Sequence, residues 1–309
     1  MVDRDTFLVA LYVMADDFCK AALPPESIRP GPAASLTRSE VVTLALFEQW
    51  GCFSGERDAY RYSEKNLRSA FPTLPDRSQF NRLARHYAYA IIAFGHYLAD
   101  LLTEPDDLYE ALDGLGVAVR HLKRRGAGWL AGLANIGWCN RLGWYEGFHV
   151  LTAVTPHGVI TGYALAPAST KEQPYGDTFL AARATQHPRL PEVGRATKKP
   201  YVTDNGFVGA ELHQRWYHLY GAYVISPPQR TSPHTWPKAL RRWLYSVRQI
   251  VETVHDKLLN TFRLARERAH ELDGFRVRLA AKVSLHNFCI WLNRQLGRPD
   301  LAFADLIDW

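Results

Sequence analysis

The hydrophobic pattern of this chain changes near residue 105, and that change constrains the fold more than any other feature. Before it, apolar residues recur at helical spacing and no segment alternates as a strand would, so an all-helical domain is expected over residues 1–105. Thr37 and Glu40 in "TRSE" form a capping box at the start of one helix. Proline-rich turns separate the predicted helices, which lie near 5–22, 38–50, 57–70 and 77–103.

After residue 105 the pattern becomes that of strands rich in Val, Ile, Tyr and Ala. The second and third of five predicted strands are joined by "PHG", a short hairpin turn, so they are expected to pair antiparallel. Helical segments follow the third, fourth and fifth strands, and this order predicts a mixed α/β sheet flanked by helices over residues 106–309. The five strands are predicted at 108–119, 146–155, 158–168, 199–206 and 221–227.

The sequence disfavours two classes, membrane proteins and disulfide-bonded secreted proteins. It has no run of about 18 apolar residues, and its start lacks the basic segment of a signal peptide. The cysteines show no CxxC or CxxH spacing, so reduced thiols are expected and structural zinc is not. They are Cys19, Cys52, Cys139 and Cys289. A cytoplasmic protein that does not bind membranes is therefore expected.

Nucleic acid is the natural partner of the clustered cations in this chain, although such runs are often only solvated surface. The net charge is +6, and the basic runs lie at 120–125, 238–243, 263–270 and 275–278. The helix predicted at 77–103 begins with polar side chains that can reach phosphates and base edges, namely Arg77, Gln79, Asn81, Arg82 and Arg85. It is a candidate recognition helix, although a partly buried helix shows the same pattern.

Two aspartates, Asp113 and Asp204, occupy positions in predicted strands that suggest a functional role. Asp113 interrupts an apolar strand, where an unpaired buried carboxylate costs several kcal/mol unless it is paired or binds a metal. Asp204 ends the fourth strand, at the edge where open α/β sheets bind their ligands. Each has a simpler explanation: a strand that ends one residue before Asp113, and a turn formed by "DNG" at residues 204–206.

A third acid, Glu252, lies beside the apolar stripe of the long helix after the fifth strand. A helix turns by about 100° per residue, so one face carries Tyr245, Arg248, Glu252, His255 and Arg263. A solvated face with an i,i+4 pair between Arg248 and Glu252 is the simpler alternative. Two aspartates and a glutamate in this order also suit a site for Mg²⁺ or Mn²⁺, and two such ions serve in-line phosphoryl transfer.

The chain resembles a known family. The order of its elements resembles the ribonuclease H-like fold of the integrase superfamily, and Asp113, Asp204 and Glu252 resemble the DDE triad of bacterial insertion-sequence transposases. "YSVRQIVE" is similar to the Tyr-two-Arg-three-Glu signature of that superfamily, carried by Tyr245, Arg248 and Glu252. "IVETVHDKL" and "YRYSEKNLRSAFPTLPDRSQFNRLAR" resemble the insertion-sequence group numbered nine-eight-two, which is related to groups four and five. "EGFHVLTAVTPHGVITGYALAPAST" is similar to the second and third strands of these proteins.

This resemblance implies a transposase that cuts double-stranded DNA at element ends and joins them to target DNA. It implies a catalytic site in which Asp113, Asp204 and Glu252 bind two Mg²⁺ or Mn²⁺ ions. It also implies that an all-α DNA-binding domain precedes the catalytic domain in the chain. It also implies a homodimer or larger assembly on DNA, associated with the nucleoid in the bacterial cytoplasm. DNA contacts are expected from Tyr245, Arg248, His255, Lys257 and Arg263, and from the polar residues of the candidate recognition helix.

Two departures from the family pattern and one further residue bear on the site. Some of these families carry a lysine seven residues after the glutamate, and here that position is Leu259. The interval between Asp204 and Glu252 leaves no room for the β-rich insertion domain of some relatives. His149, on the strand beside Asp113, is a candidate for lining the cleft or a structural histidine.

Two other functions stay open at this stage. A decayed or domesticated element would be a non-catalytic DNA-binding protein that uses the helical domain alone. A ribonuclease H-like nuclease would cut DNA without joining it. Metal-dependent strand transfer separates these from a transposase.

Overall fold

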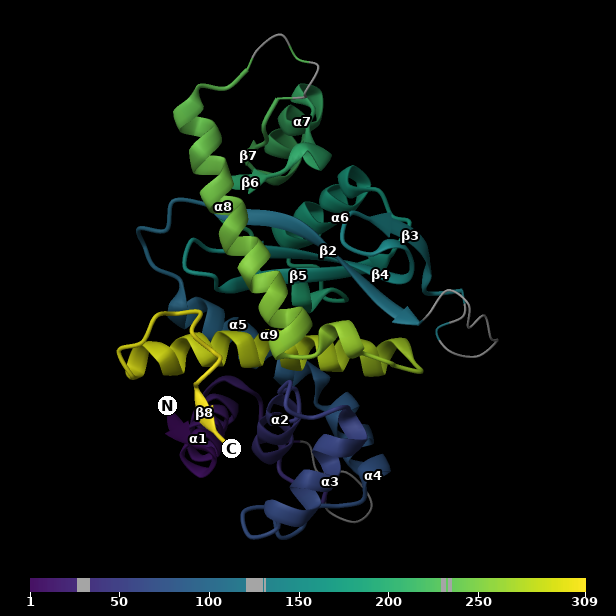
Figure 1. Cartoon of the computed structure of the whole chain (residues 1–309), viewed down its shortest axis with the longest axis vertical. Helices are drawn as coiled ribbons and strands as arrows, with labels where there is room; N and C mark the ends of the chain where they lie inside the picture. Colours follow the sequence, from purple (N-terminus) through teal and green to yellow (C-terminus); the bar gives the residue numbers. More distant parts are fainter. Residues whose placement is uncertain (27–33, 121–129, 131, 229–231, 233–234) are drawn as a thin grey trace. The chain divides into compact units, whose positions relative to one another are not determined.

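A computed structural model describes residues 1–26, 34–120, 130, 132–228, 232 and 235–309 (Figure 1). The chain forms two compact units, one of Met1–Leu98 with Leu258–Trp309 and the other of Ala99–Lys257. The predicted boundary at residue 105 falls near the first junction, but the predicted domain 106–309 does not match the second unit. Residues 258–309 group with the N-terminal helices instead. Most of the basic run at 120–125 lies outside the described residues.

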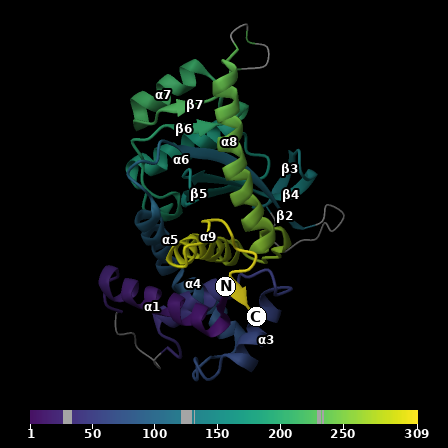
Figure 2. The ribbon, with the colours of Figure 1, turned by 60° about the vertical axis from the view of Figure 1, so that its left-hand side comes forward.

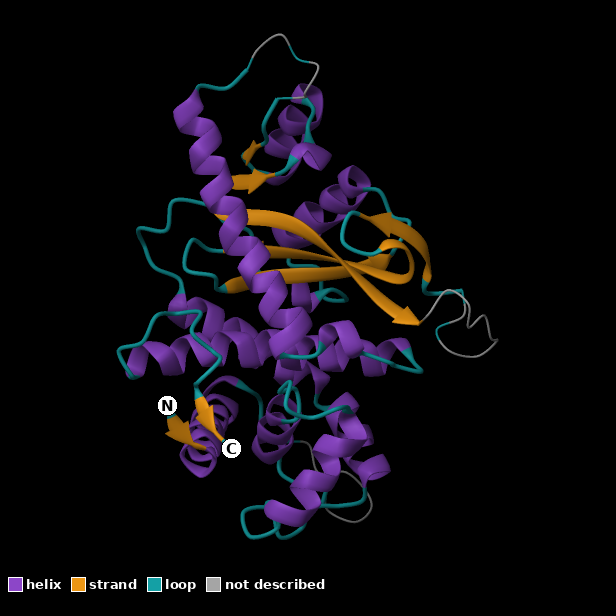
Figure 3. Ribbon diagram, viewed as in Figure 1, coloured by secondary structure: helices purple, strands orange, loops and turns teal. Residues whose placement is uncertain are grey.

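The described residues of the second unit form a six-stranded sheet (Figure 3). Its strand order is β3-β4-β2-β6-β7, with β5 also paired to β4. The strands are β2 (Glu110–Arg120), β3 (Asn135–Cys139), β4 (Gly143–Val154), β5 (Ile160–Pro167), β6 (Tyr201–Thr203) and β7 (Val224–Ile225). Five correspond to predicted strands. The sixth, β3, was not predicted. Its apolar residues Ile136 and Trp138 are exposed while Gly137 is buried, so its place in the sheet does not come from an apolar face of its own.

The sheet is mixed, as the order of elements predicts. Strand β4 pairs antiparallel with β2, β3 and β5, and the β4–β5 pair confirms the predicted hairpin. Strand β6 pairs parallel with β2 and with β7. Parallel neighbours need crossover connections. Helix α6 (Glu172–Thr185) lies before β6, and α7 (Ala210–Tyr220) lies between β6 and β7.

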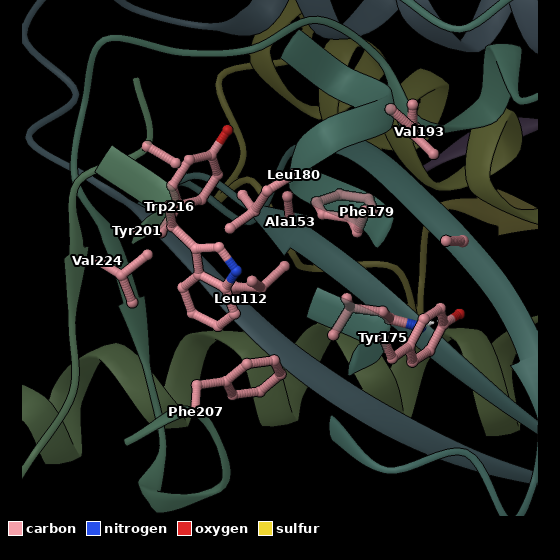
Figure 4. Close-up of a cluster of buried hydrophobic side chains, with 14 of the residues drawn as sticks. Leu112, Ala153, Tyr175, Phe179, Leu180, Val193, Tyr201, Phe207, Trp216 and Val224 are labelled. Atoms are coloured by element: carbon pink, nitrogen blue, oxygen red, sulfur yellow. Dashed lines mark hydrogen bonds between the residues drawn. The ribbon is translucent and has the colours of Figure 1, made fainter. Parts of the chain in front are cut away.

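Helices cover both faces of the sheet. Helices α6 and α7 lie on one face, and α8 (Lys238–Asp256) crosses the other (Figures 1 and 2). The core between the sheet and α6 and α7 contains Leu112 of β2, Phe179 of α6 and the fully buried Trp216 of α7 (Figure 4). Successive side chains of a strand point to opposite faces. Because Leu112 points into this core, Asp113 points to the face that α8 covers.

Where the structure describes it, the first unit has one short pair of strands and is otherwise built from helices and their connections. Helix α2 and the long helix α9 contact each other and are buried around most of their surface, which explains why the C-terminal segment belongs to this unit. Its helices are α1 (Arg4–Ala22), α2 (Arg38–Phe47), α3 (Glu56–Asn66), α4 (Arg77–His86), most of α5 (Ala88–Leu102) and α9 (Leu272–Gln295). The helix predicted at 77–103 is broken at Tyr87, a buried residue whose hydroxyl donates a hydrogen bond to Glu26. Strand β1 (Val2–Asp3) pairs parallel with β8 (Ile307–Asp308).

No helix within the described residues is both long enough and apolar enough to cross a membrane.

The predicted capping box is confirmed at the start of α2. The hydroxyl of Thr37 accepts a hydrogen bond from the Glu40 N–H at 3.3 Å, and the Glu40 carboxylate accepts one from the Thr37 N–H at 2.6 Å. Thr37→Ala is expected to lower the free energy of unfolding by about 1 kcal/mol, because it leaves a helix N–H without an acceptor. Chemical denaturation measures the loss. Thr73→Ala, at an exposed position of the same unit, is the matched control. An equal effect of both changes would contradict the capping role.

Candidate active site

Asp113 and Asp204 lie side by side on two neighbouring strands, at the point where β6 ends. The register between the parallel strands β2 and β6 ends with the pair Leu112 and Thr203, so Asp113 and Asp204 are the next residues on the two strands. Asp113 lies inside β2, which rules out the simpler explanation that the strand ends before it. Neighbouring strands are about 4.8 Å apart. The sheet therefore brings two of the three predicted acids together.

Backbone N–H groups orient both carboxylates. Asp113 Oδ1 accepts a hydrogen bond from the Gly114 N–H at 2.9 Å, and Asp204 Oδ1 accepts one from the Gly206 N–H at 2.9 Å. The turn expected at "DNG" is also present, because Asp204 caps a short 3₁₀ helix at Asn205–Phe207. Asp204 thus has a turn function and a position beside Asp113 at the same time.

The pKa of Asp113 is shifted by its burial and by the charged groups near it. Burial raises the pKa of Asp113 to about 7, and the neighbouring Asp204 adds to this shift. The Gly114 hydrogen bond and the Arg248 guanidinium act in the opposite direction. A cation next to these two aspartates would relieve their repulsion.

Glu252 lies on α8 but not in contact with the two aspartates. Its carboxylate pairs with Arg248 of the preceding turn at 3.6 Å, and its side chain is 60% exposed. This is the i,i+4 pair that the sequence offered as the simpler explanation. Arg248 itself is half-buried, and its Nε is buried without a hydrogen-bond partner among the described residues. Arg248 therefore pairs with Glu252, influences Asp113 electrostatically and keeps one unsatisfied donor.

His255 anchors α8 to the sheet opposite Asp113. Its Nε2 lies 2.8 Å from the hydroxyl of Thr152, and Thr152 pairs with Asp113 between β4 and β2. Burial lowers the pKa of His255 to about 3, so the ring is neutral. The predicted place of His255 on the polar face of α8 is wrong, because the residue is only 7% exposed and its ring is held by this hydrogen bond.

Arg263 also differs from its predicted place on the polar face. Helix α8 ends at Asp256, a π-helical turn follows at Lys257–Thr261, and Arg263 has a left-handed backbone conformation. Its buried guanidinium donates hydrogen bonds to the carbonyl groups of Glu48 and Phe53 in the first unit. The helical projection failed because it continued the helix past its end.

The other residues predicted to contact DNA have different surroundings. Tyr245 is largely exposed on α8, and Lys257 is half-buried at its end. In the first unit, the polar residues of α4 meet nearby acids. Arg77 and Asn81 contact Glu56 at 3.1 and 2.6 Å, Arg85 contacts Glu271 at 3.2 Å, and Arg82 donates to Gln79 at 3.2 Å. Arg77, Asn81 and Arg85 line a pocket of about 540 Å³.

His149 of β4 is half-buried, and its ring lies against Gly114, where a side chain on residue 114 would collide with it. Burial lowers its pKa.

One acid near the aspartates was not predicted. Glu172 is the first residue of α6, and its side chain approaches Gly206 and Asp204. Burial raises the pKa of Glu172 to about 7, and Asp204 adds to the shift. An acidic residue in the first turn of a helix is ordinary, so the sequence pattern alone did not single it out.

The donor set suits a hard divalent cation. Among the described residues, no three His, Cys, Asp or Glu side chains are grouped so that they could hold an ion as they stand. Asp113 and Asp204 nevertheless present adjacent carboxylates with oriented oxygens, which are the ligands that Mg²⁺ and Mn²⁺ prefer. A third ligand would have to turn toward them.

Comparison with known proteins gives one family. Residues 111–288, more than half of the chain, match the family model described as the transposase DDE domain. Neither a curated protein nor a solved structure matches the chain. The matched segment contains all three predicted acids and the six-stranded sheet apart from the first residue of β2. The chain therefore belongs to the transposase DDE domain family.

Proposed function

We propose that this protein is a transposase that cuts DNA at the ends of an insertion sequence and joins those ends to target DNA. The observation that carries the proposal is the pair of adjacent carboxylates, Asp113 and Asp204, in a chain of the transposase DDE domain family. Adjacent carboxylates on neighbouring strands are suited to phosphoryl transfer assisted by metal ions.

Asp113 and Asp204 would hold the divalent ions that domains of this family use, and Glu252 would complete the set after leaving Arg248. When bound, two such ions would activate water or a 3′-hydroxyl group for attack and stabilise the departing oxygen. The Gly114 and Gly206 N–H groups keep the aspartate oxygens oriented before any ion binds. The Thr152–His255 hydrogen bond fixes the end of α8, and with it the position of Glu252 one turn earlier.

The DNA backbone would lie along the exposed side of α8. Lys238, Arg241 and Arg242 are exposed at its start, and Tyr245 follows one turn later with a side chain suited to stacking. Arg248 is next in this direction, and its unsatisfied Nε is a donor for a phosphate oxygen. These side chains would form a path for DNA from the start of α8 to Arg248, which influences Asp113 electrostatically.

The first unit would supply further DNA contacts through Arg82 and Gln79 of α4 and, if their acidic partners release them, through Arg77, Asn81 and Arg85. Holding two DNA ends together would require at least two copies of the chain on DNA.

Cleavage and joining of end-labelled DNA tests the proposal. The substrate carries the terminal repeats that flank the gene, with Mg²⁺ or Mn²⁺ present, and wild type is compared with Asp204→Ala. We expect cleaved and joined products that require the metal and disappear in the variant. Asp106→Ala, at an exposed position of the same unit, is the matched control and should leave the products unchanged.

Each other outcome favours one of the alternatives. Cleavage without joining would indicate a nuclease, and binding without products would indicate a non-catalytic DNA-binding protein. Products that persist in Asp204→Ala would remove Asp204 from the site.

A further inference from the structure

Glu172 and Asp204 approach each other over one glycine. The Glu172 Oε2 atom occupies the position that a Cβ on residue 206 would take, and Asp204 Oδ1 lies 3.1 Å from that position. The two carboxylates therefore converge on the same point above the backbone of Gly206. Any other residue at this position would push the Glu172 carboxylate away.

The Glu172 carboxylate has no partner that explains this approach. Among the residues that the structure describes, none donates a hydrogen bond to Glu172 or forms an ion pair with it. The side chain is half-buried, and its nearest charged neighbour is another acid. When both are ionised, a half-buried carboxylate against a second carboxylate is unfavourable unless a cation joins them.

Glu252 contrasts with Glu172 in these respects. It is mostly exposed, and its charge is already balanced by Arg248. Asp113 is influenced by both Asp204 and Glu172, so these three acids share one electrostatic environment. The Glu172 side chain has several rotatable bonds and can turn its carboxylate toward an ion that Asp204 binds.

We infer that Glu172 is an additional ligand of the divalent metal site, beside Asp113, Asp204 and Glu252. This inference rests on the proposed function for the existence of that site. It assigns a role to the first turn of α6, and it gives Gly206 a second role besides the turn, which is to leave room for the Glu172 carboxylate. The site is then built from β2, the end of β6, α6 and α8.

Binding of Mn²⁺ to the full-length protein without DNA tests the inference. Calorimetry or the loss of the free Mn²⁺ electron paramagnetic resonance signal measures the dissociation constant, independently of activity. Glu172→Gln is expected to weaken binding by roughly tenfold or more, as the loss of a direct ligand should. Glu211→Gln makes the same chemical change in the first turn of α7, at an exposed position, and should bind like wild type.

Gly206→Ala is a second variant that keeps the Glu172 carboxylate but displaces it, so it should weaken Mn²⁺ binding too. Thermal unfolding without metal verifies that each variant is folded.

Asp204→Asn separates failure of this inference from failure of the proposed function. If Asp204→Asn weakens binding while Glu172→Gln and Gly206→Ala bind like wild type, Glu172 is not a ligand and the metal site stands without it. If none of the three changes the affinity, the proposed metal site itself is wrong.

Discussion

Replacing Asp113 by asparagine is expected to reduce metal-dependent DNA cleavage strongly and, at the same time, to stabilise the metal-free protein above pH 7. Both effects follow from the position of Asp113 in β2 beside Asp204. The proposed metal site requires this carboxylate, but without metal its charge is destabilising because burial and Asp204 raise its pKa from 3.8 to about 7. Asparagine keeps the shape and removes the charge.

The pH dependence gives the sign of the stability effect. Between about pH 4 and pH 7, folded Asp113 keeps a proton that the unfolded chain has released. Stability is therefore highest below this window and falls as the pH rises through it. Each pKa unit corresponds to about 1.4 kcal/mol, and because Asp113 is partly exposed we expect a gain of roughly 2–4 kcal/mol for Asp113→Asn near pH 8. Near pH 4 the gain should vanish.

Thermal or chemical unfolding in EDTA at these two pH values measures the gain, and the labelled-DNA assay measures cleavage. Loss of one carboxylate ligand should reduce cleavage by roughly a thousandfold. Asp106→Asn, an exposed acid of the same unit, should change neither quantity. Equal stability of wild type and Asp113→Asn near pH 8 would show that Asp113 ionises normally, and retained cleavage would exclude it from the active site.

Local sequence patterns predicted features of both units. The β4–β5 hairpin follows from alternating apolar residues around "PHG", and the capping box of α2 follows from Thr37 and Glu40. Asp113 was identified as a candidate because an unpaired carboxylate in an apolar strand is energetically unfavourable. Each of these signals lies within a few residues of the feature that it predicts.

Features that depend on distant parts of the chain were not predictable in this way. Strand β3 is held by pairing with β4 and not by its own apolar pattern, and the grouping of 258–309 with the N-terminal helices depends on packing between α2 and α9. Glu172 became conspicuous only when folding brought it to Gly206. His255 and Arg263 were misplaced because helical spacing gives a direction but not burial, and it fails where the helix ends.

The buried charges of the first unit provide the second large effect. Lys282 of α9 is fully buried, with its Nζ 2.6 Å from Gln49 Oε1 and 3.2 Å from Glu267 Oε1. Glu267 also accepts a hydrogen bond from Arg278 at 2.6 Å, and Arg278 pairs with Glu56 at 2.7 Å. Burial would raise the pKa of Glu267, but Lys282 and Arg278 outweigh it and hold the pKa at about 2. Burial lowers the pKa of Lys282 to about 8, so both groups are charged at neutral pH.

Lys282→Met is expected to lower the free energy of unfolding by about 3–5 kcal/mol, because it leaves the Glu267 charge buried with one cation fewer. The methionine fills most of the space, so the loss in stability reflects the charge more than the volume.

Adding Glu267→Gln to this variant removes the excess negative charge and leaves Arg278 paired with Glu56. The double variant should therefore be more stable than the sum of the two single effects predicts, by about 1 kcal/mol or more. Chemical denaturation of the four proteins measures this coupling, with Lys65→Met at an exposed position of α3 as the control. Additive effects would mean that Lys282 and Glu267 are buried near each other without stabilising each other.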